Sequence, residues 1–214
     1  MIDILYEDNH LLVLVKPVNI PMQEDESKDL DLLTMAKMYI KEKYNKPGNV
    51  YLGLVHRLDR PVGGVCVFAK TSKAASRLSK EIQNHQFKKE YLAVLETNKK
   101  ISDGHLEDYL LKDTKTNMVK VDPRGKLAIL DYQLIKQVSS LALVHIYLKT
   151  GRSHQIRVQF SSRHMPLYGD QRYNPYAKKG EQIALWSYRL SFIHPTLNKE
   201  MCFEAPIDRY PFNI

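Results

Sequence analysis

The alternation of apolar and polar residues predicts a chain built mainly of short strands. A short apolar run, or a strict alternation of apolar with polar residues, is typical of a strand, whereas apolar residues three or four apart are typical of one helix face. Strand patterns occupy Leu11–Val15, Val50–Leu58, Val65–Ala69, Tyr91–Leu95, Leu127–Leu134, Leu141–Leu148 and Ile183–Phe192.

Two segments have the spacing of helices, and a third fits two structures. Apolar residues recur at helical spacing over residues 32–44, and again after Ser72, which is a plausible N-cap. In residues 151–164 the apolar residues alternate as in a strand, yet Ser153 would also suit as the cap of a helix, so periodicity leaves both structures open. Several strands and few helices predict an α+β fold with a mixed, largely antiparallel central sheet and flanking helices.

Length and composition set limits on the class of protein. A chain of 214 residues fits one domain over residues 1–214. It has no apolar stretch of 18 residues and no basic start followed by an apolar run, so we expect a cytoplasmic protein without a membrane span, and a monomer. Cys66 and Cys202 are the only cysteines and are not closely spaced, which disfavours a zinc ribbon or a disulfide framework.

The charge balance favours a polyanionic partner. There are 32 Lys and Arg residues against 24 Asp and Glu residues, a formal net charge of +8. Such an excess fits a surface that attracts phosphate groups, and it equally fits a protein that is merely basic.

The segment His56-Arg57-Leu58-Asp59-Arg60 carries the first candidate chemistry. It places an acid between two arginines, just before Gly63-Gly64. Neighbouring guanidinium groups favour the ionised carboxylate, which can then act as a nucleophile, a base or a metal ligand. A loop aspartate in a structural Arg–Asp pair would give the same pattern.

The segment Lys149–Arg163 carries the second candidate chemistry. It holds four basic residues and no acidic one, which suits contact with phosphate or a clamp on a buried carboxylate. A solvated basic face is the alternative. The three histidines His56, His154 and His164 lack any spacing typical of metal ligands, so we predict no metal site.

Together these segments resemble the RluA family of pseudouridine synthases. The resemblance covers roughly residues 11–206 and has the family's motifs in their order. Its pieces are Val15-Lys16-Pro17, His56-Arg57-Leu58-Asp59, Ala69-Lys70, Lys89-Glu90-Tyr91-Leu92-Ala93, Thr150–Arg157, Gly169-Asp170, Tyr173 and Leu190–Pro195. The family usually has Thr-Ser-Gly or Ser-Ser-Gly where this chain has Val62-Gly63-Gly64, and often His at Gln159 and a His-Ala pair at Trp186-Ser187.

The resemblance implies the pseudouridine synthase fold and an enzyme that isomerises uridines of structured ribosomal or transfer RNA. It implies an Asp59 nucleophile, base flipping, and no metal or organic cofactor. By motif position Arg157 pairs with Asp59, Tyr91 stacks on the target base, and Arg57 reaches into the RNA helix. Many members carry an RNA-binding domain of the S4 type before the core, and we expect a stand-alone core here. The residues expected to bind RNA are Arg57, Arg60, Lys70, Lys88, Lys89, Arg152, His154, Gln155 and Arg163.

Two other classes of function fit parts of the sequence. A non-catalytic RNA-binding protein on the same core would have no need of Asp59. A nucleic-acid glycosylase or a glycoside hydrolase would usually need two carboxylates flanking the bond, and Asp59 is the one acid to which the matched motifs assign a catalytic role.

Overall fold

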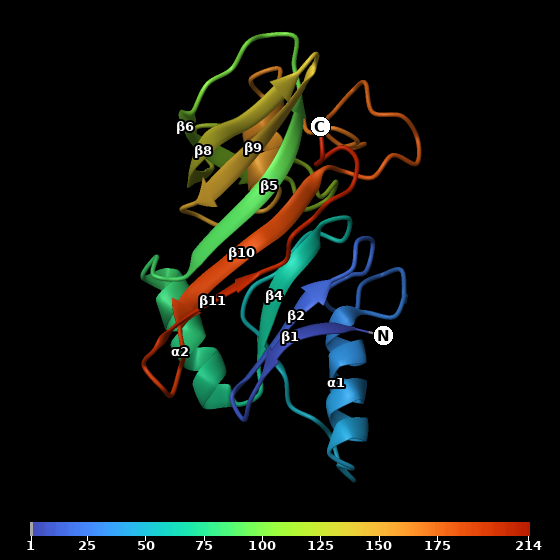
Figure 1. Ribbon diagram of the computed structural model, residues 1–214, viewed down its shortest axis with the longest axis vertical. Coiled ribbons are helices and arrows are strands. Elements are labelled where there is room, and N and C mark those ends of the chain that lie inside the picture. The colour runs from blue at the N-terminus through green and yellow to red at the C-terminus, as the bar shows by residue number, and fades with distance from the viewer. Residues whose placement is uncertain (1) are drawn as a thin grey trace. The chain divides into compact units, whose positions relative to one another are not determined.

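Over residues 2–214, the computed structural model has eleven strands and three helices (Figure 1). Contacts divide the chain into two compact units: unit 1 is the chain up to Phe87 with Ser187–Ala205, and unit 2 is Lys88–Trp186 with Pro206–Ile214. The prediction of a single domain over 1–214 stays a prediction. No helix in the described chain is long and apolar enough to cross a membrane.

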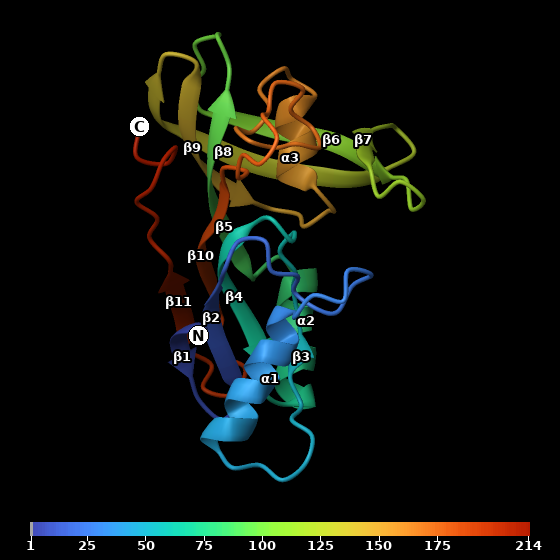
Figure 2. The same cartoon turned by 90° about the vertical axis from the view of Figure 1, so that its right-hand side faces the viewer.

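Unit 1 is an antiparallel sheet with two helices. Its strands follow the order β1-β2-β4-β10, with β11 on β10 and β3 on β4. Every residue of β4 is buried, and Figure 2 shows both helices on the same face of these strands. The elements are β1 (Asp3–Glu7), β2 (Leu11–Lys16), α1 (Leu32–Lys43), β3 (Gly53–Leu54), β4 (Gly63–Ala69), α2 (Ser72–Gln83), β11 (Glu200–Glu204) and β10 (Leu185–Ile193), whose first two residues belong to unit 2.

Unit 2 is a second antiparallel ladder with one short helix. Its strands follow the order β5-β9-β8-β6-β7, and the helix α3 packs against β6 and β7. Val158 of α3 joins Leu110, Val119 and Ala128 in an apolar cluster that fixes the helix on the sheet. The elements are β5 (Lys88–Glu96), β6 (Gly104–Lys112), β7 (Val119–Val121), β8 (Lys126–Val138), β9 (Leu141–Leu148) and α3 (Gln155–Ser161).

The predicted fold class is confirmed, since the sheet is largely antiparallel and the helices are few. The predicted strand over Val50–Leu58 is wrong for most of its length, because only Gly53–Leu54 pairs with β4. The Nε2 atom of the His56 ring accepts the backbone N–H of Val67 at 3.2 Å. That β4 donor is therefore satisfied by a side chain instead of a neighbouring strand.

Two predicted helix caps need correction. The N-cap of α2 is Thr71, whose Oγ1 accepts the backbone N–H of Ala74 at 3.1 Å, and Ser72 is the first helical residue. The ambiguous segment 151–164 contains a helix, α3, preceded by His154 in a left-handed conformation without a side-chain cap, so Ser153 is not the cap. All six residues 155–160 are buried, and a helix buried on all sides shows no amphipathic period.

Gly64 tests how tightly β4 fits against β10. Its φ is +113°, and a Cβ atom there would lie 2.1 Å from the backbone oxygen of Ser187. We expect Gly64→Ala to lower the free energy of unfolding by roughly 2 kcal/mol or more. Gly48→Ala is the control, because a Cβ there meets nothing within 4 Å. Thermal unfolding measures both variants, and equal midpoints would contradict this account of β4.

A buried carboxylate ties β1 to α1. Glu7 accepts hydrogen bonds from the hydroxyls of Tyr39 and Tyr44 and from the ammonium groups of Lys43 and Lys70, at 2.7–3.0 Å. Burial by itself raises the pKa of Glu7, but these four donors outweigh it and lower the pKa from 4.5 to about 2.

The depressed pKa predicts a pH dependence of stability. Its contribution is fully present above the ordinary pKa of 4.5 and is lost as the pH falls through about 2. Glu7→Gln should therefore unfold at a lower temperature than wild type at pH 7, with the gap narrowing between pH 4.5 and 2. Thermal scans across that range measure it, with the exposed Glu24→Gln as control. A gap that is constant with pH would refute the assignment.

Candidate active site

Asp59 lies at the end of an extended segment that is held in place by its buried side chains. The side chains of His56 and Leu58 are buried, Arg57 is exposed and Asp59 is half-buried. The backbone then turns, and the carbonyl oxygen of Asp59 accepts the N–H of Val62 at 2.9 Å. Alternating burial fixes this strip of chain and leaves Asp59 half-buried at its end.

A buried lysine holds the turn that follows Asp59. Lys16, at the end of β2, has no exposed surface. Its Nζ atom donates to the carbonyl oxygens of Pro17, Arg60 and Val62 at 3.0, 2.9 and 2.7 Å. Burial lowers the pKa of Lys16 to about 8, while the charge of Asp59 acts in the opposite direction. The carboxylate of Asp59 thus lies in the electrostatic field of a fixed, buried cation of the same unit.

Arg60 is engaged by an acidic loop. Its guanidinium contacts the carboxylates of Asp29 and Asp25 and the hydroxyl of Ser27, all on the exposed surface of unit 1. Exposed ion pairs of this kind are weak and screened by salt. An incoming phosphate can therefore compete with the loop for Arg60.

Tyr91 belongs to unit 2 and lies in the middle of β5. Its residue pairs with Ile146 of β9, and its side chain is buried. Side chains two residues apart on a strand share a face, so Lys89 and Tyr91 project from the same face of β5.

Arg157 is held by a buried carboxylate in unit 2. Its Nε and Nη2 atoms donate to the two oxygens of Asp170 at 2.8 and 2.6 Å, and the carboxylate has no exposed surface. The guanidinium also lies over the ring of Tyr173, 5.1 Å from its centroid. The predicted pair between Arg157 and Asp59 joins residues of different units and stays a prediction.

Gln155 has an internal role in addition to any contact with RNA. Its side-chain oxygen accepts from the hydroxyl of Thr150 and the N–H of Arg152, and its amide donates to the carbonyl of Ile129 and to Gln159. The bond to Ile129 ties the start of α3 to β8, and the other three hold the loop before the helix and its first turn. The RNA contact predicted for Gln155 is not tested by them.

The neighbouring basic side chains divide into anchored and exposed ones. His154 contacts the hydroxyl of Tyr173 through Nδ1 at 2.7 Å, and Arg163 forms a two-atom ion pair with Asp108. Lys70 is almost buried and pairs with Glu7 at 2.7 Å. The remaining predicted RNA contacts have solvent-facing or half-buried side chains: Arg57, Lys88 and Arg152 are exposed, and Lys89 is half-buried.

The sequence did not assign roles to Lys16, Asp170 or Asp108. Lys16 and Asp170 belong to the quoted motifs, but the motifs did not predict which residues they contact. Asp170 is 13 residues from Arg157, and Asp108 is 55 from Arg163, separations that no local pattern reports. No group of three or more His, Cys, Asp or Glu side chains in the described chain is placed to hold a metal ion.

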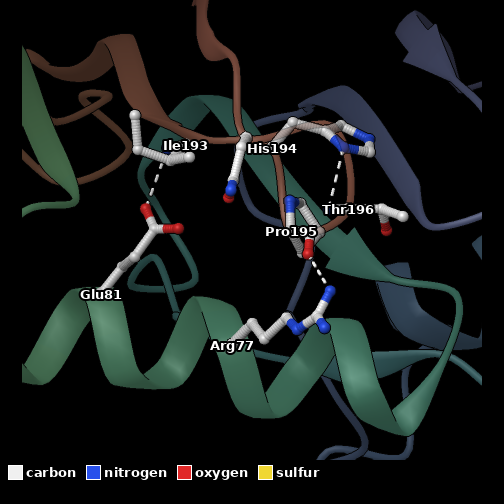
Figure 3. Close-up of a pocket in the computed structure, with 7 residues that line it drawn as sticks. Arg77, Glu81, Ile193, His194, Pro195 and Thr196 are labelled. Atoms are coloured by element: carbon white, nitrogen blue, oxygen red, sulfur yellow. Dashed lines mark hydrogen bonds between the residues drawn. The ribbon is translucent and has the colours of Figure 1, made fainter.

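One concave site of unit 1 lies apart from these residues. A cavity of about 350 Å³ is lined by Arg77 and Glu81 of α2 and by the chain after β10 (Figure 3). Glu81 accepts the N–H of Ile193, Arg77 donates to the carbonyl of Pro195, and the buried His194 accepts two backbone N–H groups at Nδ1. Its polar groups are used to hold the turn after β10, and none of the predicted site residues lines it.

Comparison with known proteins assigns the chain to a family. The family model for RNA pseudouridylate synthase matches residues 10–162. The chain is 33% identical over 218 residues to ribosomal large subunit pseudouridine synthase C of Buchnera aphidicola, covering 96% of this chain and 67% of that protein. It is 30% identical over 218 residues to ribosomal large subunit pseudouridine synthase D of Zymomonas mobilis, covering 95% of this chain and 68% of that protein.

Solved structures agree in fold. Human RNA pseudouridylate synthase domain containing 4 superposes with a TM-score of 0.81 at 22% identity, over 98% of this chain and 90% of that one. Human RNA pseudouridylate synthase domain containing 1 superposes with a TM-score of 0.77 at 20% identity, over 97% of this chain and 84% of that one. With the family model matching most of its length, this chain belongs to the RNA pseudouridylate synthase family.

Proposed function

We propose that this protein isomerises uridine to pseudouridine in structured RNA, with Asp59 as the nucleophile. The observation that carries the proposal is the placement of Asp59: a half-buried carboxylate at a turn whose carbonyl groups are held by the buried Lys16 ammonium. The Lys16 ammonium fixes the turn that carries this carboxylate, and a carboxylate is the group that the chemistry needs. The sequence around Asp59 lies within the residues that match the family model.

The reaction breaks the bond between uracil N1 and the ribose, turns the base and joins carbon 5 to the ribose. An ionised carboxylate can act on the ribose or on the base, or take up a proton. Tyr91 is proposed to stack on the uracil, with its hydroxyl as an acid or a base. A uridine inside a helix has to leave its stack to be reached, so base flipping is part of the proposal.

The proposed substrate is ribosomal or transfer RNA. The two relatives named above are ribosomal large subunit enzymes, which favours ribosomal RNA. The exposed Arg57, Lys88 and Arg152 are proposed to contact RNA phosphates, and Arg60 does so by exchanging its acidic loop for phosphate. We further propose that the protein acts in the cytoplasm as a monomer.

Asp59→Asn should abolish product formation without unfolding the protein. The amide keeps the size of the side chain and removes the anionic nucleophile. Tritium release from RNA labelled at carbon 5 of uridine measures the reaction, and circular dichroism monitors the fold. Asp208→Asn, an exposed acid in unit 2, is the matched control and should react at the wild-type rate. Release by Asp59→Asn at close to that rate would remove Asp59 from the mechanism.

Arg157 is proposed to align and ionise Asp59, which predicts an order of effects on rate. A guanidinium holds a carboxylate through two parallel bonds, whereas an ammonium is a point charge on a flexible stem. Arg157→Lys should therefore slow the single-turnover rate at saturating enzyme by on the order of tenfold. Arg157→Ala should slow it further. By contrast, Arg163→Ala is expected mainly to weaken RNA binding in a salt-dependent way.

The buried pair with Asp170 supplies the control for Arg157. Asp170→Asn weakens the same ion pair from its other side and leaves the guanidinium in place. If Arg157 serves only to hold Asp170, Arg157→Lys and Asp170→Asn should lower stability alike and leave similar rates once both are folded. A rate loss confined to Arg157→Lys supports the role at Asp59, and equal rates oppose it.

A further inference from the structure

Lys89 is a half-buried cation on the same face of β5 as Tyr91. Its residue pairs with Leu148 of β9, two positions along the ladder from the pair of Tyr91 with Ile146. Two residues of a strand span about 6.6 Å, and Glu90 between them projects from the opposite face. The Lys89 side chain is therefore a near neighbour of the tyrosine proposed to stack on the uracil.

The ammonium of Lys89 lies against an exposed glycine. A Cβ atom added at Gly151 would be 2.9 Å from Lys89 Nζ, and no other non-neighbouring heavy atom would lie within 4 Å of it. Gly151 is exposed and begins the segment that contains Arg152. The glycine therefore leaves room for the Lys89 amino group beside an exposed segment of unit 2, where a side chain would collide with it.

The charge of Lys89 lacks the acceptors that other enclosed cations have. Lys16 has three carbonyl oxygens, Lys70 has Glu7, and Arg157 has Asp170. Within residues 2–214, Lys89 Nζ makes no hydrogen bond and no ion pair. Burial lowers its pKa as a result. A partly desolvated ammonium without an acceptor is unfavourable, and an anionic ligand would relieve it.

We propose that Lys89 binds the RNA phosphodiester adjacent to the uridine that is modified, at a site kept open by Gly151. The inference rests on the proposed function, which makes RNA the ligand and places the uracil on Tyr91. A base and the phosphate of its own nucleotide are separated by a distance comparable to two residues of β5. The proposal gives Lys89 one specific phosphate, next to the reacting nucleotide, and not only a general attraction to RNA.

A coupling experiment tests this assignment. Lys89→Met keeps the length of the side chain and removes its charge, and a methylphosphonate at one position removes the charge of one phosphate. Binding of wild type and Lys89→Met is measured on the natural RNA and on RNAs carrying a single methylphosphonate at each phosphate around the target. Lys112→Met, an exposed lysine at the end of β6, is the matched control.

On natural RNA, Lys89→Met should bind on the order of tenfold more weakly, and the slope of log K against log salt should fall by roughly 0.7–0.9, the value for one phosphate contact. With methylphosphonate at the target-adjacent phosphate, wild type and Lys89→Met should bind alike. Lys112→Met should behave as wild type on every RNA.

Equal losses for Lys89→Met on all RNAs would overturn the proposal and reduce Lys89 to a packing role against Gly151. Coupling to a distant phosphate would overturn its placement beside the target. Circular dichroism checks the fold, and Lys89→Gln repeats the cycle if the methionine variant does not fold. Tritium release by wild type on natural RNA tests the proposed function separately, so an active enzyme without coupling refutes only the inference.

Discussion

Lys16 places a positive charge in the interior of unit 1, where three backbone carbonyl oxygens take the place of water. Two of these carbonyls belong to Arg60 and Val62, on either side of the turn that follows Asp59. The bonds connect the end of β2 to a loop more than forty residues later. Carbonyl dipoles satisfy the ammonium only partly, which is why its pKa is lowered to about 8. The position of the candidate nucleophile depends on this arrangement.

Unit 2 also contains a buried cation, and there an anion compensates its charge. Arg157 and Asp170 are both buried, and their two parallel hydrogen bonds compensate for the loss of water around each. A second polar network on the same helix runs from the carbonyl of Ile129 in β8 through Gln155 and Gln159 to Asp108. Removing one member would leave others buried and unsatisfied. The helix α3 is thus held as much by polar contacts as by the apolar side of Val158.

The sequence predicted the strand-rich fold and the chemical segments, because both depend on local patterns. Strands β2 and β4 follow directly from short runs of apolar residues, and β9 follows from the alternation of apolar with polar residues. The pattern was silent on α3, whose polar Gln155 and Arg157 are as buried as its apolar residues. Gln155 and Arg163, which are predicted to bind RNA, also have internal partners, Thr150 and Asp108, that no local pattern indicated. Those partners are set by the tertiary fold and leave no trace in spacing.

The bond between His56 and β4 fixes the tautomer of the imidazole. To accept the N–H of Val67, Nε2 has to keep its lone pair, so the ring proton of the neutral form resides on Nδ1. A proton on Nε2 would point at the backbone N–H of Val67, and the hydrogen bond between His56 and β4 would be lost. His56 is only three residues from Asp59, but Nε2 cannot transfer protons while it accepts this hydrogen bond. The contribution of His56 that the structure shows is therefore mechanical: its ring ties the segment before Asp59 to β4.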